Sequence, residues 1–367
     1  MKNSVISLAL ILIYNVMFAQ QDTTMPENTF PSNSLTISGY VEPYYSYDFN
    51  NPNDHLKPDL FYSFNRHNEV SLNLGLIKVN YNADRVRANF ALMTGTYTQY
   101  NLAAEPNVLQ SIFEANAGYK LSENADFWVD AGILPSHIGF ESAIGKDNWV
   151  LTRSIPAENS PYFETGVRLS YYSPNEQWYL AALYLNGWQR LVRPYGNNTP
   201  AFGTQITYKP GDAVALNWST FIGNDKPNEI AQWRFFNNFY GIFQLNHDFG
   251  LTAGFDIGME EEAKGEVKGT NLWFSPIIIA RLALNDKLAI GARAEYYADE
   301  EGVIITTDTP HGFKTFGYSV NLDYQITANA LFRIEGRALK SEDEIFLIKN
   351  KPSDNNYFFT TSLGISF

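Results

Sequence analysis

The segment 357–367, YFFTTSLGISF, decides the fold because its two faces differ along its length. Every second residue is apolar, aromatic or threonine: Tyr357, Phe359, Thr361, Leu363, Ile365 and Phe367. The residues between them, from Thr360 onward, are the small and mostly polar Thr360, Ser362, Gly364 and Ser366. Side chains alternate between the two faces of a strand, so the segment is predicted to be a strand with one apolar face. A flat strand of this kind needs a partner, because unpaired backbone groups at a sheet edge invite aggregation.

The segment 35–49, LTISGYVEPYYSYDF, is the candidate partner. One parity carries Leu35, Ile37, Val41, Tyr45, Tyr47 and Phe49, and the other carries Thr36, Ser38, Glu42, Ser46 and Asp48. If the first and last strands pair, the sheet closes and has no edge. In a membrane this closure is compulsory, because hydrocarbon offers the backbone no hydrogen-bond partner.

Composition narrows the class of protein. The chain has 367 residues, a net charge of −13 and no cysteine. Beyond the N-terminus it has no run of roughly 18 apolar residues, which a membrane helix needs. The absence of cysteine excludes disulfides and thiolate metal sites. The acidic balance argues against a nucleic-acid partner.

The N-terminus resembles a secretory signal. Lys2 precedes an apolar run from Val5 to Ile13, and Ala19-Gln20 is a plausible cleavage site. We therefore expect a cleaved signal peptide over 1–20, a flexible periplasmic lead-in over 21–34 and a transmembrane barrel over 35–367. A buried N-terminal helix is the alternative interpretation of the first segment.

Short polar turns alternate with long polar connections along the rest of the chain, which is typical of an outer-membrane barrel. The expected strands are 35–49, 69–81, 85–97, 111–120, 126–134, 162–172, 177–187, 201–209, 213–223, 233–247, 251–259, 271–284, 288–298, 313–326, 330–340 and 357–367. The predicted fold is an all-β, antiparallel up-and-down β-barrel of about 16 strands, with short periplasmic turns and long extracellular loops. A soluble sandwich or propeller would also alternate, but neither predicts the asymmetry of the connections.

Three hairpins allow the strand register to be predicted, because a slip of one residue moves every side chain to the other face. The turn at 210–212 sets Tyr208 against Val214, Ile206 against Leu216 and Thr204 against Trp218. The turn at 327–329 sets Tyr324 against Phe332, Leu322 against Ile334 and Asp323 against Arg333. The turn at 82–84 sets Leu76 against Phe90 and Leu74 against Leu92.

The inward parity of these strands holds the ionisable residues. The predicted lumen-facing set is Glu42, Arg87, Glu114, Asp130, Arg168, Asp256, Arg281, Arg293, Glu295, Asp323, Arg333, Glu335 and Arg337. About sixteen strands make an interior too wide for wall side chains to fill, so we expect water inside. Arg281 is expected opposite Gly291, and Arg337 opposite Ser319 as an unpaired charge. The alternative is local pairing, in which Glu295 and Glu335 neutralise the arginines.

The segment 136–161 is the longest connection and is the candidate constriction loop, with Glu141, Asp147 and Glu158 as its acidic residues. If it folds inward, its acids would face the arginine wall; the alternative is a loop that caps the outside. It lies between WVDAGILPSHIGFE (128–141) and PYFETGV (161–167). With these flanks, the chain resembles the OmpL-like porin-2 family of outer-membrane β-barrels over residues 35–367. The resemblance implies a porin-like channel and carries over neither a substrate nor catalytic residues.

No catalytic, metal or cofactor site is predicted. His137 and Glu141 have a spacing that suits a metal only on a helix, and Pro135 and Gly139 argue against a helix. The strands offer no outward Ser–His set for a lipase.

The sequence therefore favours a non-enzymatic outer-membrane channel for passive diffusion of small hydrophilic solutes. The alternative is a loop-plugged barrel that acts as an adhesin or as part of a secretion or envelope assembly. The expected partners are outer-membrane lipid, the solutes, and the barrel-assembly machinery through the C-terminal strand, and an oligomer is compatible with this interpretation.

Overall fold

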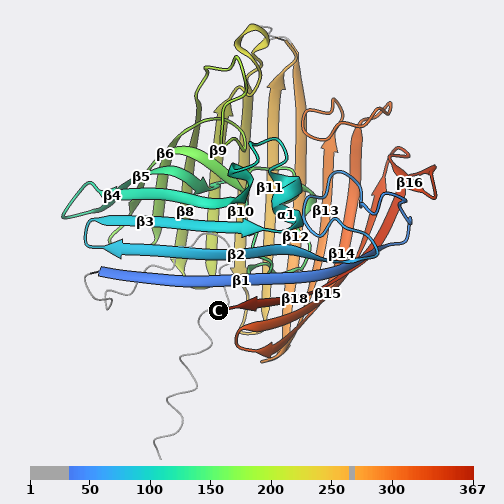
Figure 1. Ribbon diagram of the computed structural model, residues 1–367, viewed down its shortest axis with the longest axis horizontal. Coiled ribbons are helices and arrows are strands. Elements are labelled where there is room, and N and C mark those ends of the chain that lie inside the picture. The colour runs from blue at the N-terminus through green and yellow to red at the C-terminus, as the bar shows by residue number, and fades with distance from the viewer. Residues whose placement is uncertain (1–32, 264–268) are drawn as a thin grey trace, which may run out of the picture.

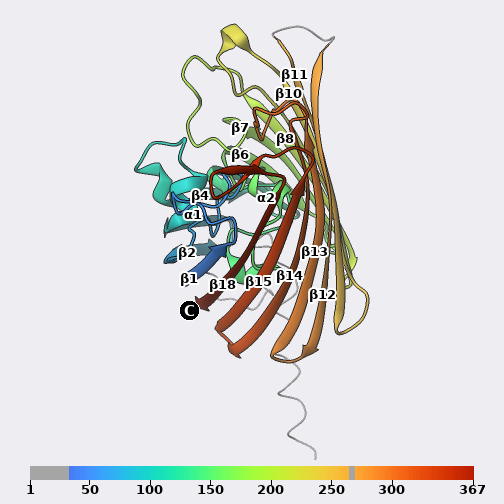
Figure 2. The same ribbon diagram turned by 90° about the vertical axis from the view of Figure 1, so that its right-hand side faces the viewer.

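The computed structural model describes residues 33–263 and 269–367, which form one closed antiparallel barrel (Figures 1 and 2). Its sixteen wall strands are β1 Asn33–Asp48, β2 Val70–Ala83, β3 Val86–Thr94, β4 Ile112–Lys120, β5 Asp126–Pro135, β6 Phe163–Tyr172, β7 Trp178–Leu185, β8 Ala201–Gly211, β9 Val214–Gly223, β10 Arg234–Gln244, β11 Phe249–Glu261, β12 Thr270–Asn285, β13 Leu288–Asp299, β14 Phe313–Thr327, β15 Ala330–Ser341 and β18 Asn355–Ser366. The predicted fold and strand number are confirmed. The expected signal peptide, and all but the last two residues of the lead-in, lie outside the described residues.

The long connections contain short helices, 3-10 turns and a hairpin. They are the helices α1 Thr96–Asn101 and α2 Ile155–Glu158, the 3-10 turns Leu109–Ser111, Gly145–Asp147 and Asn228–Ile230, and the hairpin of β16 Phe346–Ile348 with β17 Lys351–Ser353. The third strand ends earlier than expected, since α1 follows Gly95 at once. Gly95 has φ 127°, and a Cβ there would lie 2.4 Å from the Asn73 carbonyl oxygen, so the chain turns where only glycine fits. No helix within residues 33–263 or 269–367 is long and apolar enough to cross a membrane.

The first and last strands close the wall. In β18, Ile365 pairs with Val41 of β1 and Ser362 pairs with Arg333 of β15. The final contact is reciprocal: the Gly39 amide donates to the Phe367 carbonyl at 2.8 Å, and the Phe367 amide donates to the Gly39 carbonyl at 3.0 Å. The strand that suggested closure in the sequence is therefore hydrogen-bonded on both sides.

The predicted registers are reproduced to different degrees. At 327–329 the predicted pairs are confirmed, including Asp323 with Arg333. At 210–212 the faces are right but the register is displaced by two residues, because a bulge between Tyr208 and Gly211 lengthens the turn.

At 82–84 the predicted register is wrong. The prediction would leave only Ala83 to make the turn, whereas the structure pairs Asn82 with Arg87 across a four-residue connection. The observed register differs from the predicted one by three residues. Because three is an odd number, the β2 residues that the prediction paired with Phe90 and Leu92 lie on the other face of the sheet. Leu74 and Leu76 are buried inside the barrel, while Phe90 and Leu92 of β3 are exposed outside.

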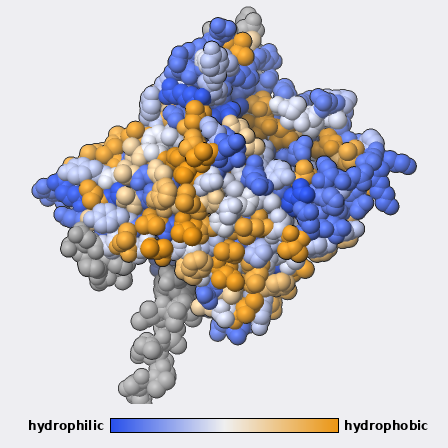
Figure 3. All heavy atoms as spheres, in the orientation of Figure 1, coloured by the Kyte–Doolittle hydropathy of each residue, from blue (hydrophilic) through white to orange (hydrophobic). Residues whose placement is uncertain are grey.

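Large apolar side chains cover the outer face of the wall. Figure 3 shows hydrophobic residues gathered over the barrel strands and hydrophilic residues over the projecting loops. In β7, exposed Trp178, Leu180 and Tyr184 alternate with buried residues along the whole strand. This is the alternation expected when one face meets lipid.

The outer face yields the first prediction. Val320 lies near the middle of β14 and is 62% exposed. We expect Val320→Arg to lower the free energy of unfolding by about 2–4 kcal/mol, because it puts a charge into hydrocarbon. Urea titration in lipid vesicles measures this change. Val320→Met is the matched apolar control, and equal stability of the two variants would contradict the outward assignment.

Closure yields the second prediction. Deleting residues 363–367 removes the partners of Tyr40 and Val41 in β1. We expect loss of the folded barrel, because the freed backbone groups would lie in hydrocarbon unsatisfied. Heat-modifiable mobility in native gels reports the folded form, and a truncated chain that still shows it would refute this role of β18.

Candidate functional site

The connection between β5 and β6, residues 136–162, crosses the interior of the barrel and is called loop 3. At its start, His137 Nε2 lies 2.7 Å from the Thr220 carbonyl of β9. At its middle, Arg333 of β15 donates to the Gly145 carbonyl at 2.7 Å. These two strands are six positions apart around the wall, so loop 3 spans the lumen rather than capping the outside.

Inward-facing glycines make room for loop 3. A Cβ at Gly203 of β8 would lie 2.5 Å from His137 Nε2. At Gly254 of β11 it would lie 3.0 Å from the Phe140 ring, and at Gly291 of β13 it would lie 2.6 Å from the Trp149 carbonyl oxygen. Any side chain at Gly291 would therefore displace the loop backbone.

Loop 3 is fastened to β13 and β15 by buried carboxylates. Glu335 accepts from the Thr152 amide at 2.5 Å and from the Thr152 hydroxyl at 2.9 Å. Glu295 accepts from the Ile155 amide at 2.6 Å. Hydrogen bonds to a charged acceptor are among the strongest in proteins, so these contacts fix the loop at the wall.

Arginines from the same two strands complete this network. Arg293 lies 3.2 Å from Glu295 and 3.0 Å from Glu335, and it donates to the Thr152 carbonyl at 2.5 Å. Arg337 lies 2.5 Å from Glu295 and donates to the Arg153 carbonyl at 2.7 Å. The expectation of an unpaired Arg337 is therefore wrong, and local pairing prevails.

The strand between them explains the reach of these side chains. The predicted pairing of Arg337 with Ser319 of β14 is confirmed, and Ser319 also pairs with Arg293 of β13. Two residues earlier in β14, Gly317 pairs with Glu295. Small residues on β14 thus let charges from both neighbouring strands meet across it.

The three candidate acids of loop 3 have different surroundings. Glu141 is buried, accepts from the Ser154 amide at 3.1 Å and lies 3.9 Å from Arg293. Burial raises its pKa, and Arg293 opposes that shift. Thus Glu141 belongs to the network with the wall.

Glu158 and Asp147 complete the set. Buried Glu158 accepts from the Tyr62 amide at 3.0 Å and so ties loop 3 to the connection between β1 and β2. Burial raises the pKa of Glu158, against the charge of Arg153. Asp147 is partly exposed and lies 2.5 Å from Lys146. The three acids therefore do not form one acidic face.

Two groups on opposite walls share another arrangement, in which two arginines flank one aspartate. On the β3–β6 wall, Arg87 binds Asp130 through two hydrogen bonds of 2.7 and 2.6 Å, and Arg168 lies 3.3 Å from the same carboxylate. On the β12–β15 wall, Arg333 binds Asp323 at 2.6 and 3.2 Å. Arg281 lies 3.7 Å from Asp323 and, as predicted, opposite Gly291.

Glu42 is a further member of the candidate set. It is buried in β1 and accepts from Asn73 at 2.9 Å. Its carboxylate faces Gly145 of loop 3, where a Cβ would lie 2.1 Å from an oxygen of Glu42.

A small cavity of about 20 Å³ lies between loop 3 and strands β10, β11 and β12. Its lining residues are Phe140, Glu141, Asp147, Asn148, Trp149, Ile242, Thr252 and Ile279. Within the described ranges, no three His, Cys, Asp or Glu residues are grouped so that they could hold a metal ion.

Comparison with known proteins identifies the family. Residues 34–367 match a family described as "Putative beta-barrel porin-2, OmpL-like". The chain belongs to this family. Among curated proteins, none matches it.

Solved structures similar to this porin-family barrel show the fold. An anion-selective porin from Comamonas acidovorans has a TM-score of 0.60 at 11% identity, over 91% of this chain and 100% of that one. The outer membrane channel DcaP of Acinetobacter baumannii has a TM-score of 0.60 at 10% identity, over 92% and 98%. The trimer form of OmpT from Vibrio cholerae has a TM-score of 0.60 at 9% identity, over 92% and 100%. The family and the fold are those of bacterial outer-membrane porins.

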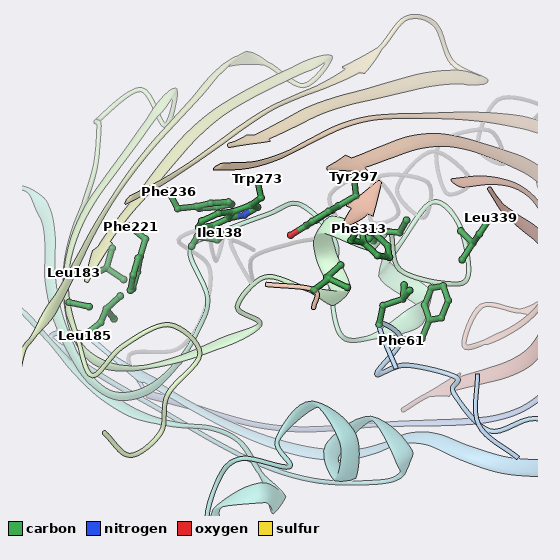
Figure 4. Close-up of a cluster of buried hydrophobic side chains, with 14 of the residues drawn as sticks. Phe61, Ile138, Leu183, Leu185, Phe221, Phe236, Trp273, Tyr297, Phe313 and Leu339 are labelled. Atoms are coloured by element: carbon green, nitrogen blue, oxygen red, sulfur yellow. The ribbon is translucent and has the colours of Figure 1, made fainter. Parts of the chain in front are cut away.

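Apolar packing fills part of the lumen of this porin, where the sequence predicted mainly water. Figure 4 shows Phe221, Phe236 and Trp273 of the wall lying with Ile138 of loop 3 in one buried cluster. The connection between β1 and β2 adds Phe61 to the same cluster. Loops, rather than wall side chains, occupy this part of the interior.

Among the buried cations that sequence reasoning missed, two come from the connections that enter the lumen. Arg153 of loop 3 is fully buried and its guanidinium faces the rings of Phe64 and Tyr97. Lys57 of the β1–β2 connection is 3% exposed and lies 4.1 Å from the centre of the Phe358 ring. One signal was present for Arg153, since it is the only arginine between residues 136 and 161 of the sequence.

Lys57 yields the third prediction. Burial lowers the pKa of Lys57 to about 7, and the charge of Arg337 adds to the shift. Between pH 7 and about 10 the unfolded chain therefore binds a proton that the folded chain does not, so stability rises with pH in this window. The slope is about 1.4 kcal/mol per pH unit for one proton.

The test of the Lys57 prediction is a series of urea titrations from pH 7 to 10, which compares the wild type with Lys57→Met. The variant should lose this slope, because methionine fills a similar volume without a titrating group. Arg193→Met, in a long connection, is the control that should keep it. Parallel slopes for wild type and Lys57→Met would contradict the prediction.

Proposed function

We propose that this outer-membrane porin is a passive channel for small hydrophilic solutes, and that loop 3 sets the width of the passage. The observation that carries the proposal is the course of loop 3 through the lumen, fastened at both walls by buried hydrogen bonds. A segment held in this way reduces the width of the passage through a sixteen-strand barrel. The proposal contains no catalytic step and no cofactor.

Several further roles belong to this proposal. Residues 1–20 direct export and are cleaved, and the C-terminal strand presents the chain to the barrel-assembly machinery. Outer-membrane lipid covers the apolar outer face. An oligomer is compatible with the fold, since OmpT of Vibrio cholerae has a trimer form.

A second function, that of a loop-plugged barrel serving adhesion or an envelope assembly, is favoured by one observation. The buried cluster joins three parts of the chain that face one another in the lumen: the wall, loop 3 and the β1–β2 connection. If this packing leaves no continuous water path, the barrel conducts only when loop 3 is removed.

Single-channel recording in planar bilayers separates these two functions and is the fourth prediction. We expect discrete conductance steps for the wild type, and larger steps when residues 142–153 are replaced by a short Gly-Ser linker. Tyr195→Ser, a change at a fully exposed loop residue, is the control that should leave the steps unchanged. Steps from the shortened variant alone would establish the plugged barrel, and silence from both proteins would refute a channel.

A further inference from the structure

The two arginine–aspartate–arginine groups have the same internal asymmetry. We call Arg87, Asp130 and Arg168 the β5 triad, and Arg281, Asp323 and Arg333 the β14 triad. In each triad one arginine holds the carboxylate with two hydrogen bonds of 2.6–3.2 Å. The second arginine lies further away, at 3.3 Å for Arg168 and 3.7 Å for Arg281.

This asymmetry leaves one positive charge in excess in each triad. The aspartates have side-chain exposures of only 0% and 5%, so solvent does not compete for them. A bidentate arginine already neutralises each aspartate. The second arginines, Arg168 and Arg281, have side-chain exposures of 20% and 26%, so they present their charge to the lumen.

The triads lie on opposing walls, each toward the end of the barrel that carries the short turns. Asp130 is four residues from the start of β5, and Asp323 is four residues from the end of β14. Both of these strand ends lead into short turns. Around the cylinder, β5 and β14 are seven strands apart in one direction and nine in the other. A solute at this level therefore passes between the two charges.

Several neighbouring charges are themselves paired, while the Glu42 carboxylate faces Gly145 of loop 3, whose carbonyl accepts from Arg333. On the β5 side, Lys78 pairs with Glu114 at 3.1 Å, and Lys120 lies 3.6 Å from Asp126. On the β14 side, Lys146 of loop 3 pairs with Asp147 at 2.5 Å. Each pair is balanced. The acids of the short turns, Asp84, Glu123, Glu176, Asp212, Asp248 and Asp286, lie at the rim of the barrel, where salt screens them over about 10 Å.

We infer that the two triads form a region of the channel that attracts anions, and that the solutes of this channel are small anions such as carboxylates. The inference rests on the proposed channel function and assigns its solute class. It runs against the net charge of −13, because the charges that line the passage at the triads, rather than the total charge, act on a solute there.

Reversal potentials in a tenfold KCl gradient test the inference and are the fifth prediction. We expect the wild type to prefer chloride, and Arg168→Gln and Arg281→Gln each to lower the chloride-to-potassium permeability ratio. A unit charge about 4 Å from an ion in water changes its local concentration about fivefold, which sets the scale of each loss. The folds should survive, because Arg87 and Arg333 still pair with the aspartates.

Two controls make the result specific. Arg168→Lys should keep the preference, because it keeps the charge. Arg193→Gln, in a long connection, should also keep it. Potassium preference in the wild type would overturn the inference, and so would a double Arg168→Gln/Arg281→Gln variant that conducts with unchanged selectivity.

A measurement without current separates this inference from the channel function. Carbon-13 acetate should show line broadening with the detergent-solubilised wild-type barrel and lose it with the double glutamine variant, while methylammonium should show none with either. This result would support the anion site even in a barrel that conducts nothing. Equal acetate broadening by both proteins would overturn it.

Discussion

The constraint on which the structure depends is that hydrocarbon offers no partner to a backbone amide or carbonyl. The wall meets it by pairing each strand with two neighbours, including the reciprocal bonds between Gly39 and Phe367 that complete the circle. A closed wall in turn imposes alternation, since every second side chain must face lipid. The interior then becomes the place where long connections can bury apolar and charged groups.

Loop 3 uses that interior in a way that depends on paired charge. A buried carboxylate or guanidinium is costly unless it is hydrogen-bonded and neutralised. The carboxylates of Glu295 and Glu335 are neutralised by arginines of the wall and also accept hydrogen bonds from amides of the loop. The network therefore both compensates for the buried charges of the wall and fixes the position of the loop.

The same principle explains why the arginines differ in role. Arg293 and Arg337 form ion pairs with carboxylates and donate to loop carbonyls, so their charge is neutralised and they hold the loop in place. Arg168 and Arg281 each share an aspartate that another arginine already binds, so their charge faces the lumen. Inward parity alone does not distinguish these cases.

The sequence by itself determined the wall. Alternating polarity, short and long connections and the apolar final strand predicted the closed barrel and its strand number, because each strand carries the signature of its two faces. The register was predictable at Asp323–Arg333, where the turn is regular. It failed at Asn82–Arg87, because the length of a turn depends on local backbone geometry that residue types leave open.

Only the tertiary structure decided the interior. The candidate residues have partners from distant segments of the chain: Thr152 for Glu335, and Tyr62 for Glu158. Sequence spacing carries no information about such contacts, because they form only after closure brings loop 3 against the walls. Whether an arginine holds a loop or faces water is therefore settled by packing, which no single strand encodes.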